Sequence, residues 1–254
     1  MTHNPLSAGQ LAGKTAFVSG SSRGIGAATI GYFAEAGARV AINFRNKEAR
    51  AIKLRDQIVD QGGSAITVGA DLTDYDTINS LRDTLAAEFG GLDILVLNAS
   101  GGMESGMGDG YAMRLNRDAQ VNLLTTLRPL LHEGSRVVFV TSHQAHFIHQ
   151  KDTMDDYAPV ALSKRAGEDA LRELIPSLEA DGIGFTVVSG DMIEGTVTAT
   201  LLDRSNPGAL ESRKAAVGKL YNVEEFAAEV AAAAVDPVPA DNTRLVGDVS
   251  DFLS

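Results

Sequence analysis

The stretch Tyr157-Ala-Pro-Val-Ala-Leu-Ser-Lys164 places a phenol seven residues before a lysine amine. A phenol can act as a general acid, whereas the valine at position 160 has no proton to donate. At 3.6 residues per turn, seven residues fall about 20° short of two helical turns, so both side chains can share one helix face. Pro159 favours the first turn of a helix, which indicates that Tyr157 lies at or before the helix cap. Tyr157 is therefore the candidate proton donor of this stretch.

Three histidines, His143, His146 and His149, follow Ser142 at a spacing of three residues. Imidazole nitrogens bind zinc, but the chain has no cysteine and no carboxylate pattern that completes a recognisable metal site. We therefore predict no metal. Histidine titrates near neutral pH, which makes His143 or His146 a second candidate for the proton donor.

Seven short apolar runs predict the strands that must position these side chains. Their nearly continuous apolar character is typical of a parallel sheet covered by helices on both faces. The runs are Thr15–Ser19, Arg39–Phe44, Ala65–Val68, Ile94–Leu97, Arg136–Thr141, Phe185–Val188 and Arg244–Val246. Helical segments alternate with them, which predicts an α/β fold, a doubly wound parallel sheet of the Rossmann type with about seven strands. In this architecture a ligand binds at the carboxyl ends of the strands.

Helix signals punctuate the segments between the strands. A helix is expected over Ser163–Ala180, where it carries Lys164. Thr73 with Asp76, and Asn222 with Glu225, are interpreted as capping boxes at two other helix starts.

A glycine-rich turn, Ser19-Gly-Ser-Ser-Arg-Gly-Ile-Gly26, joins the first strand to the first helix. Gly20 permits a tight turn, Gly24 lets the backbone approach a pyrophosphate, and Gly26 allows the helix to pack closely on the sheet. The helix N-terminus adds partial positive charge. The turn therefore predicts a dinucleotide site whose further contact residues are Ser22, Arg23 and Ile25.

The end of the second strand bears on the choice of cofactor. It reads Asn-Phe-Arg-Asn-Lys and lacks the acidic residue that would bind a free ribose 2′-hydroxyl. Arg45 and Arg23 can converge on a 2′-phosphate, which favours NADP(H) over NAD(H). The alternative is that Arg45 and Lys47 are solvated charges. Asp71 and Leu72, after the third strand, are expected at the adenine, and the alternative role of Asp71 is to cap the next helix.

Composition limits the other functions of the chain. Because the chain has 254 residues and no low-complexity tract, we expect a single domain over 1–254. Residues 1–12 are expected to be flexible. A substrate lid is expected over 194–219, with a second, glycine-rich lid segment at 101–110. The formal net charge of −11 disfavours nucleic-acid binding. No apolar run is long enough to cross a bilayer and the first residues are unlike a signal peptide, so a cytoplasmic protein without a membrane partner is expected.

Taken together, the motifs of this chain resemble those of the short-chain dehydrogenase/reductase family over nearly its whole length. The glycine turn, the segment Leu97-Asn98-Ala99-Ser100, and Ser189-Gly190 followed by Ile193 and Thr196 match family motifs, with Leu97 and Ser100 in place of an Asn and a Gly. The resemblance implies that Asn122 supports a water chain, Ser142 orients the substrate oxygen, Tyr157 donates the proton and Lys164 holds the nicotinamide ribose. It also implies a dimer or tetramer and cofactor contacts from Asn98, Ala99, Gly190 and Ile193.

Val160 is the main departure from the family, because most members keep a tyrosine there, four residues before the lysine. The Tyr157-(x)6-Lys164 spacing is similar to that of enoyl-acyl-carrier-protein reductases, a branch that reduces a conjugated C=C bond. In that reaction negative charge develops on a carbonyl oxygen two carbons from the carbon that takes hydride, which suits a displaced phenol. The alternative is that Tyr157 is a loop aromatic and the chain has lost or rebuilt its acid.

Two functional hypotheses follow from these residues. The first is an NADPH-dependent reductase that transfers hydride to an activated C=O or C=C bond of an acyl, ketone or polyketide-like substrate. The tyrosine spacing favours an enoyl thioester, whereas Ser142 and the ordinary glycine turn suit a carbonyl such as a 3-oxoacyl group. The second hypothesis is a catalytically silent NADP(H)-binding sensor or scaffold protein, and it rests on Val160.

Overall fold

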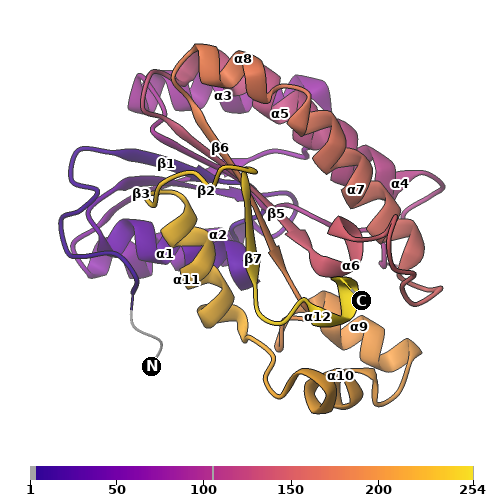
Figure 1. Ribbon diagram of the computed structural model, residues 1–254. Helices are drawn as coiled ribbons and strands as arrows, with labels where there is room; N and C mark the ends of the chain where they lie inside the picture. Colours follow the sequence, from indigo (N-terminus) through magenta and orange to yellow (C-terminus); the bar gives the residue numbers. More distant parts are fainter. Residues whose placement is uncertain (1–3, 105, 254) are drawn as a thin grey trace.

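The computed structural model describes residues 4–104 and 106–253, and in them seven parallel strands form one sheet in the order β3-β2-β1-β4-β5-β6-β7 (Figure 1). The prediction of a doubly wound α/β sheet is confirmed, and each predicted strand agrees with an observed one to within two residues at either end. The strands are β1 (Thr15–Val18), β2 (Arg39–Phe44), β3 (Ser64–Gly69), β4 (Ile94–Leu97), β5 (Arg136–Ser142), β6 (Gly184–Gly190) and β7 (Thr243–Val246). Because all pairs are parallel, the carboxyl ends of the strands lie at one edge of the sheet.

Helices cover both faces of this sheet (Figure 1). One face carries α1 (Gly24–Glu35), α2 (Glu48–Asp60) and α11 (Val223–Ala233), and the other carries α3 (Tyr75–Phe89), α5 (Ala119–Leu127), α7 (Ala158–Arg172) and α8 (Ile175–Ala180). The shorter elements are α4 (Tyr111–Met113), a π-helix (Arg114–Asp118), a 3-10 turn (Arg128–Leu130), α6 (His143–His146), α9 (Val197–Ser205), α10 (Ala209–Val217) and α12 (Ser250–Leu253). None of the helices in the described ranges combines the length and apolar character of a membrane span.

The core explains why the strands appear in the sequence as continuous apolar runs. Ala16 and Val18 of β1 belong to the hydrophobic cluster beneath α1 and α11, whereas Phe17 between them belongs to the cluster beneath α3 and α5. Both faces of the strand are therefore buried, so no polar alternation survives. A third, smaller cluster joins α6, α7 and the 192–220 region, and it contains Tyr157 and Leu202.

The N-terminal segment differs from the expectation of flexibility over residues 1–12. Leu6 and Leu11 are each 5% exposed, and the Asn4 Nδ2 donates to the carbonyl of Tyr32 on α1 at 3.1 Å. Burial of these two leucines ties residues 4–12 to the domain, while residues 1–3 lie outside the described residues.

Two helix boundaries also differ from the predictions. The single helix expected over Ser163–Ala180 is two helices, because α7 ends at Arg172 and α8 begins at Ile175. Pro176 lies in the first turn of α8, where its missing N–H removes the hydrogen bond that would continue α7. The N-cap of α3 is Asp74, which accepts from the Asp76 N–H, and not Thr73. At α11 the capping box of Asn222 and Glu225 is confirmed.

Candidate active site

A cavity of about 620 Å³ lies at the carboxyl ends of the strands, from the end of β3 to the end of β6, and helix α9 forms part of its wall. Most predicted site residues line it: Gly20, Ser22, Arg23, Gly24, Ile25, Gly26, Arg45, Asp71, Leu72, Asn98, Ala99, Ser142, Tyr157, Lys164 and Ile193. Gly190 and Asn122 do not line it. The strand order reverses between β1 and β4, which makes this edge the expected ligand site of a doubly wound sheet.

The glycine turn has the backbone geometry that a close ligand approach requires. Gly20 and Gly24 have φ angles of +64° and +56°, in the region that disfavours side chains. A Cβ atom on Gly26 would lie 2.6 Å from Asn98 Nδ2 and 2.9 Å from the Gly20 carbonyl oxygen. Only glycine at position 26 therefore lets α1 start this close to the ends of β1 and β4, with its N–H groups toward the cavity.

Asn43 holds this turn in place, and the sequence analysis did not identify it. Its buried side chain accepts from the Gly20 N–H at 2.9 Å and donates to the carbonyls of Val68 and Ala70 at 3.3 and 3.4 Å. It thereby joins the turn after β1 to the end of β3. The available signal was a polar residue inside the apolar run of β2, because a buried amide must find hydrogen-bond partners.

Asp71, which the sequence places near the adenine, makes mainly local contacts. Its carboxylate accepts from the N–H and the hydroxyl of Thr73 at 3.0 and 2.7 Å. It orders the turn between β3 and α3, where Asp74 is the helix cap. The alternative role as the helix cap is therefore not observed.

Tyr157 and Ser142 lie together at the other end of the cavity. Ser142 ends β5 and caps α6, and its Oγ is 3.1 Å from the hydroxyl oxygen of Tyr157. Tyr157 is the N-cap of α7, with Pro159 in the first turn, and it lines the same cavity as Lys164. Its ring is 4% exposed, and burial raises the pKa of the phenol while the hydrogen bond with Ser142 opposes that rise. At neutral pH the phenol is protonated and can donate.

Val160 packs beside Tyr157 in the same hydrophobic cluster and does not line the cavity. It is 3% exposed, and a Cβ on Gly102 would lie 3.1 Å from its Cγ2 atom. The aliphatic side chain thus fills the space between α7 and the 101–110 segment, of which Ser105 lies outside the described residues.

Lys164 lines the cavity and forms no hydrogen bond or ion pair with any residue that the structure describes. Burial lowers the pKa of its ammonium group to about 8, and the carboxylate of Glu168 one turn later acts in the opposite direction. A partly buried cation without a hydrogen-bond acceptor is suited to bind hydroxyl groups of a ligand.

Neither Asn116 nor Asn122 lines the cavity, and the role expected for Asn122 stays a prediction. Asn122 lies on α5 outside the cavity wall, and its side chain has no hydrogen-bond partner among the described residues. Asn116 lies in the π-helix, is 2% exposed, and exchanges hydrogen bonds with the Gly101 backbone at 2.8 and 3.1 Å. It also donates to Ser163 Oγ at 2.9 Å, on the residue before Lys164.

The three histidines lie outside the cavity wall, which removes them as substitute donors. His143 is fully buried between Ser189 Oγ and the Val246 carbonyl oxygen, at 2.8 and 3.1 Å from its two ring nitrogens. Burial lowers the pKa of His143 to about 4, so the ring is neutral at physiological pH. His149 is exposed, and the described residues contain no group of three metal-ligating side chains.

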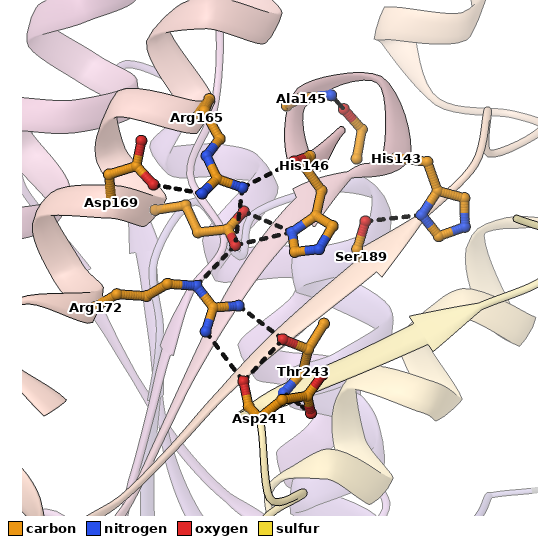
Figure 2. Close-up of polar contacts among 11 residues, drawn as sticks. His143, Ala145, His146, Arg165, Asp169, Arg172, Ser189, Asp241 and Thr243 are labelled. Atoms are coloured by element: carbon orange, nitrogen blue, oxygen red, sulfur yellow. Dashed lines mark hydrogen bonds and ion pairs between the residues drawn. The ribbon is translucent and has the colours of Figure 1, made fainter. Parts of the chain in front are cut away.

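His146 belongs to a buried ion network that anchors α7 (Figure 2). Its Nδ1 lies 2.8 Å from a carboxylate oxygen of Glu168, a fully buried residue that also accepts from Arg172 Nε at 2.9 Å. Figure 2 shows Arg172 reaching on to Thr243, whose hydroxyl accepts from Arg172 Nη2 at 2.7 Å. The network joins α6, α7 and β7, and so fixes the helix that carries Lys164.

The predicted lid over 194–219 consists mainly of α9 and α10. Val197, Ala199 and Leu202 of this region line the cavity. Arg213 of α10 donates to the carboxylate of the cavity residue Asp191 at 2.7 Å and pairs with Asp251 of α12. Helix α9 thus forms part of the cavity wall, and Arg213 ties α10 to the rim. The assignment of this region as a lid stays a prediction.

A family model and several known proteins are similar to this chain. The family model described as short chain dehydrogenase matches residues 14–206. A versicolorin reductase of Emericella nidulans is 34% identical over 142 residues, which cover 54% of each chain. A probable tetrahydroxynaphthalene reductase of Zymoseptoria tritici is 33% identical over 169 residues, which cover 64% of this chain and 62% of the relative. The chain thus spans between about half and two thirds of the length of these two relatives.

Two solved structures resemble the fold over most of its length. A short chain dehydrogenase from Burkholderia cenocepacia in complex with NADP has a TM-score of 0.77 at 26% identity, covering 93% of this chain and 97% of that one. The angucycline C-6 ketoreductase LanV with bound NADP has a TM-score of 0.73 at 27% identity, covering 90% and 91%.

Proposed function

The chain belongs to the short-chain dehydrogenase/reductase family, and on that premise we propose that it is an NADPH-dependent reductase of a ketone carbonyl in an acyl or polyketide-like substrate. The observation that carries the proposal is the 3.1 Å contact between the Ser142 and Tyr157 hydroxyls. Two hydroxyls this close can both reach one substrate oxygen. Ketone reduction needs this arrangement, because the oxygen that takes the proton is bonded to the carbon that takes the hydride.

The structure gives less support to reduction of a C=C bond. That hypothesis relied on a phenol displaced along the helix from Lys164. Tyr157 is displaced to the N-cap of α7, but its hydroxyl lies beside that of Ser142. We therefore expect Tyr157 and Ser142 to act on the same oxygen, without the separation that conjugate reduction favours.

NADP(H) fits the cavity on three observations. The Gly26 site has no room for a side chain, as a helix start beside a pyrophosphate requires. Lys164 has no acceptor of its own among the described residues, so ribose hydroxyls can take that place. Four basic side chains at the other end of the cavity form no ion pair with a described carboxylate: Arg23, Arg45, Lys47 and Arg50. The NADP complexes of the two solved relatives support the same cofactor.

The residues of the chain then have distinct roles in the reaction. When bound, NADPH supplies the hydride. Tyr157 donates the proton to the substrate oxygen, and Ser142 holds that oxygen beside it. The ammonium group of Lys164 binds ribose. The hydrogen bond with Ser142 opposes the rise that burial causes in the pKa of Tyr157.

The substrate end of the cavity suits a largely apolar molecule. Met192, Val197 and Leu202 contribute aliphatic surface there, and Gln144 donates to Asp191 at 3.1 Å at the rim. Reductases of versicolorin and of an angucycline, both named among the relatives, support a flat, polyketide-like ketone as the substrate class.

The proposal is tested by NADPH binding, followed by NADPH consumption. NADPH fluorescence should report binding, and consumption should follow with acetoacetyl thioester or with members of a panel of fused-ring ketones. Crotonyl thioester should be consumed at least about tenfold more slowly than the best ketone. Faster turnover of crotonyl thioester would shift the assignment to C=C reduction. Binding without turnover of any substrate would favour a silent cofactor-binding protein.

Two further expectations stay predictions. We expect a dimer or tetramer that buries the outer face of α7, where Leu162 is 49% exposed. We also expect the protein to act in the cytoplasm on a small molecule, without nucleic acid or membrane as a partner.

A further inference from the structure

Tyr111 lines the cavity beside Arg45. It is the first residue of α4 and follows Gly110, whose φ of +74° turns the chain into the helix. Its ring is 7% exposed and packs in the core cluster beneath α3 and α5. The ring is therefore held by the core while it also lines the cavity.

The hydroxyl of Tyr111 contacts the exposed side chain of Arg45. Arg45 Nη1 donates to the Tyr111 oxygen at 2.5 Å, and the guanidinium carbon lies 5.8 Å from the centre of the Tyr111 ring. No described carboxylate forms an ion pair with Arg45. A long side chain at the surface is thus fixed by a neutral partner, which leaves its positive charge available to an anion.

The hydroxyl of Tyr111 also has a proton to give. Burial raises the pKa of this phenol despite the opposing charge of Arg45, with smaller upward effects from Glu104 and Asp71, so it is protonated at neutral pH. Its oxygen accepts from Arg45, and no described group accepts its proton. An anion bound to Arg45 can therefore receive a second hydrogen bond from the same tyrosine.

We propose that Tyr111 determines cofactor specificity: it positions Arg45 for the 2′-phosphate of NADP(H) and donates a hydrogen bond to that phosphate. The inference rests on the proposed function, because it requires NADP(H) as the cofactor. It adds a residue from the segment after β4 to a phosphate site otherwise formed by the ends of β1 and β2. A free ribose 2′-hydroxyl gains little from this pair, so the effect is confined to the phosphorylated cofactor.

The test compares NADPH and NADH affinity in Tyr111→Phe. This substitution keeps the ring in the core and removes the hydroxyl alone. Titration by cofactor fluorescence should show the dissociation constant for NADPH rising about tenfold, as expected for a lost hydrogen bond to a charged group. The dissociation constant for NADH should change by less than about twofold on the same principle. Tyr75→Phe, on the exposed face of α3, is the matched control and should change neither constant.

Arg45→Ala supplies the second variant. If Tyr111 acts partly through Arg45, the double variant should lose less NADPH affinity than the product of the two single losses. If Tyr111→Phe lowers the affinity for NADPH and NADH equally, or lowers neither, the inference is overturned. In that case NADPH binding by the wild type still leaves the proposed function standing. A wild type that prefers NADH would overturn both.

Discussion

At the scale of single residues, Lys164 has an ammonium group suited to bind ribose hydroxyls, but burial disfavours the charged form of that group. Burial lowers the pKa of its ammonium group to about 8 from the ordinary 10.5. Function therefore has a stability cost at this position, as is common for groups placed for ligands.

Lys164→Met should separate the two effects. Methionine has a similar length and no charge. At neutral pH and without cofactor, the free energy of unfolding of the variant should therefore be about 1–2 kcal/mol higher than that of the wild type. NADPH turnover should be lost. Urea unfolding and NADPH consumption measure the two quantities.

The sign of the pH dependence gives an internal control. Between pH 8 and 10.5 the unfolded chain holds more protons on this lysine than the folded chain, so the wild type gains stability as pH rises through that window. The methionine variant lacks this gain, and the two unfolding curves should approach each other. A variant that is less stable at neutral pH would contradict the account of Lys164.

The role of a residue was predictable from the sequence where only one residue type fits the position. It was not predictable where two residues of the same type lie close together in the sequence. Gly26 was predictable because only glycine fits its site. Asn116 and Asn122 are two asparagines on one helical segment, and nothing in their spacing shows which one meets Gly101. The π-helix decides between them, since it brings Asn116 against the Gly101 backbone.

At the scale of elements, Gly167 sets how closely α7 approaches this π-helix. A Cβ atom on Gly167 would lie 2.1 Å from the carbonyl oxygen of Asn116. A π-helix inserted in a helical segment is frequent at functional sites, and here it packs beside the helix that carries Lys164.

Gly167→Ala should therefore force α7 away from the π-helix. The free energy of unfolding should fall by about 1–3 kcal/mol, and turnover should fall as Lys164 and Asn116 move apart. Gly31→Ala is the matched control, because Gly31 also lies within a helix but a Cβ there meets nothing within 4 Å. It should leave activity unchanged and raise stability by about 0.5–1 kcal/mol. Equal effects from both substitutions, measured by urea unfolding, would contradict the packing argument.

Prolines made the boundaries of α7 partly predictable. Pro159 indicated that Tyr157 lies at the helix cap, as observed. Pro176 is an equally clear signal for the break between α7 and α8, and the prediction of one helix over Ser163–Ala180 did not use it. The position of the Tyr157 hydroxyl was not predictable, because it depends on Ser142 at the end of a different element.

At the scale of the whole molecule, the acidic chain concentrates unpaired basic side chains at one end of its cavity. The formal net charge is −11, yet Arg23, Arg45, Lys47 and Arg50 form no ion pair with a described carboxylate. The fold itself was predictable, since a parallel sheet buried on both faces leaves uninterrupted apolar runs in the sequence. The site was predictable only to the edge of the sheet, since the contacts within it are made by loops.

His143 links the stability of the molecule to pH. Its neutral ring joins α6 to β6 and to the end of β7, and burial lowers the pKa of the ring from 6.5 to about 4. As pH falls from 6.5 to 4, the unfolded chain takes up the proton first, so stability is lost across this window.

His143→Gln should flatten that loss. Between pH 7 and pH 4.5 the wild type should lose about 2 kcal/mol more of its unfolding free energy than the variant, because glutamine keeps a hydrogen-bonding amide and does not titrate. Urea unfolding at the two pH values measures the difference. A parallel decline in both proteins would assign the acid sensitivity to other groups.

The most direct measurement is the rate of NADPH consumption by Tyr157→Phe, with the best ketone found for the wild type and with Tyr75→Phe as the control. The account predicts a rate about 10²- to 10⁴-fold lower, with NADPH affinity unchanged and the control fully active. Wild-type turnover in Tyr157→Phe would show that the buried phenol beside Ser142 is not the proton donor.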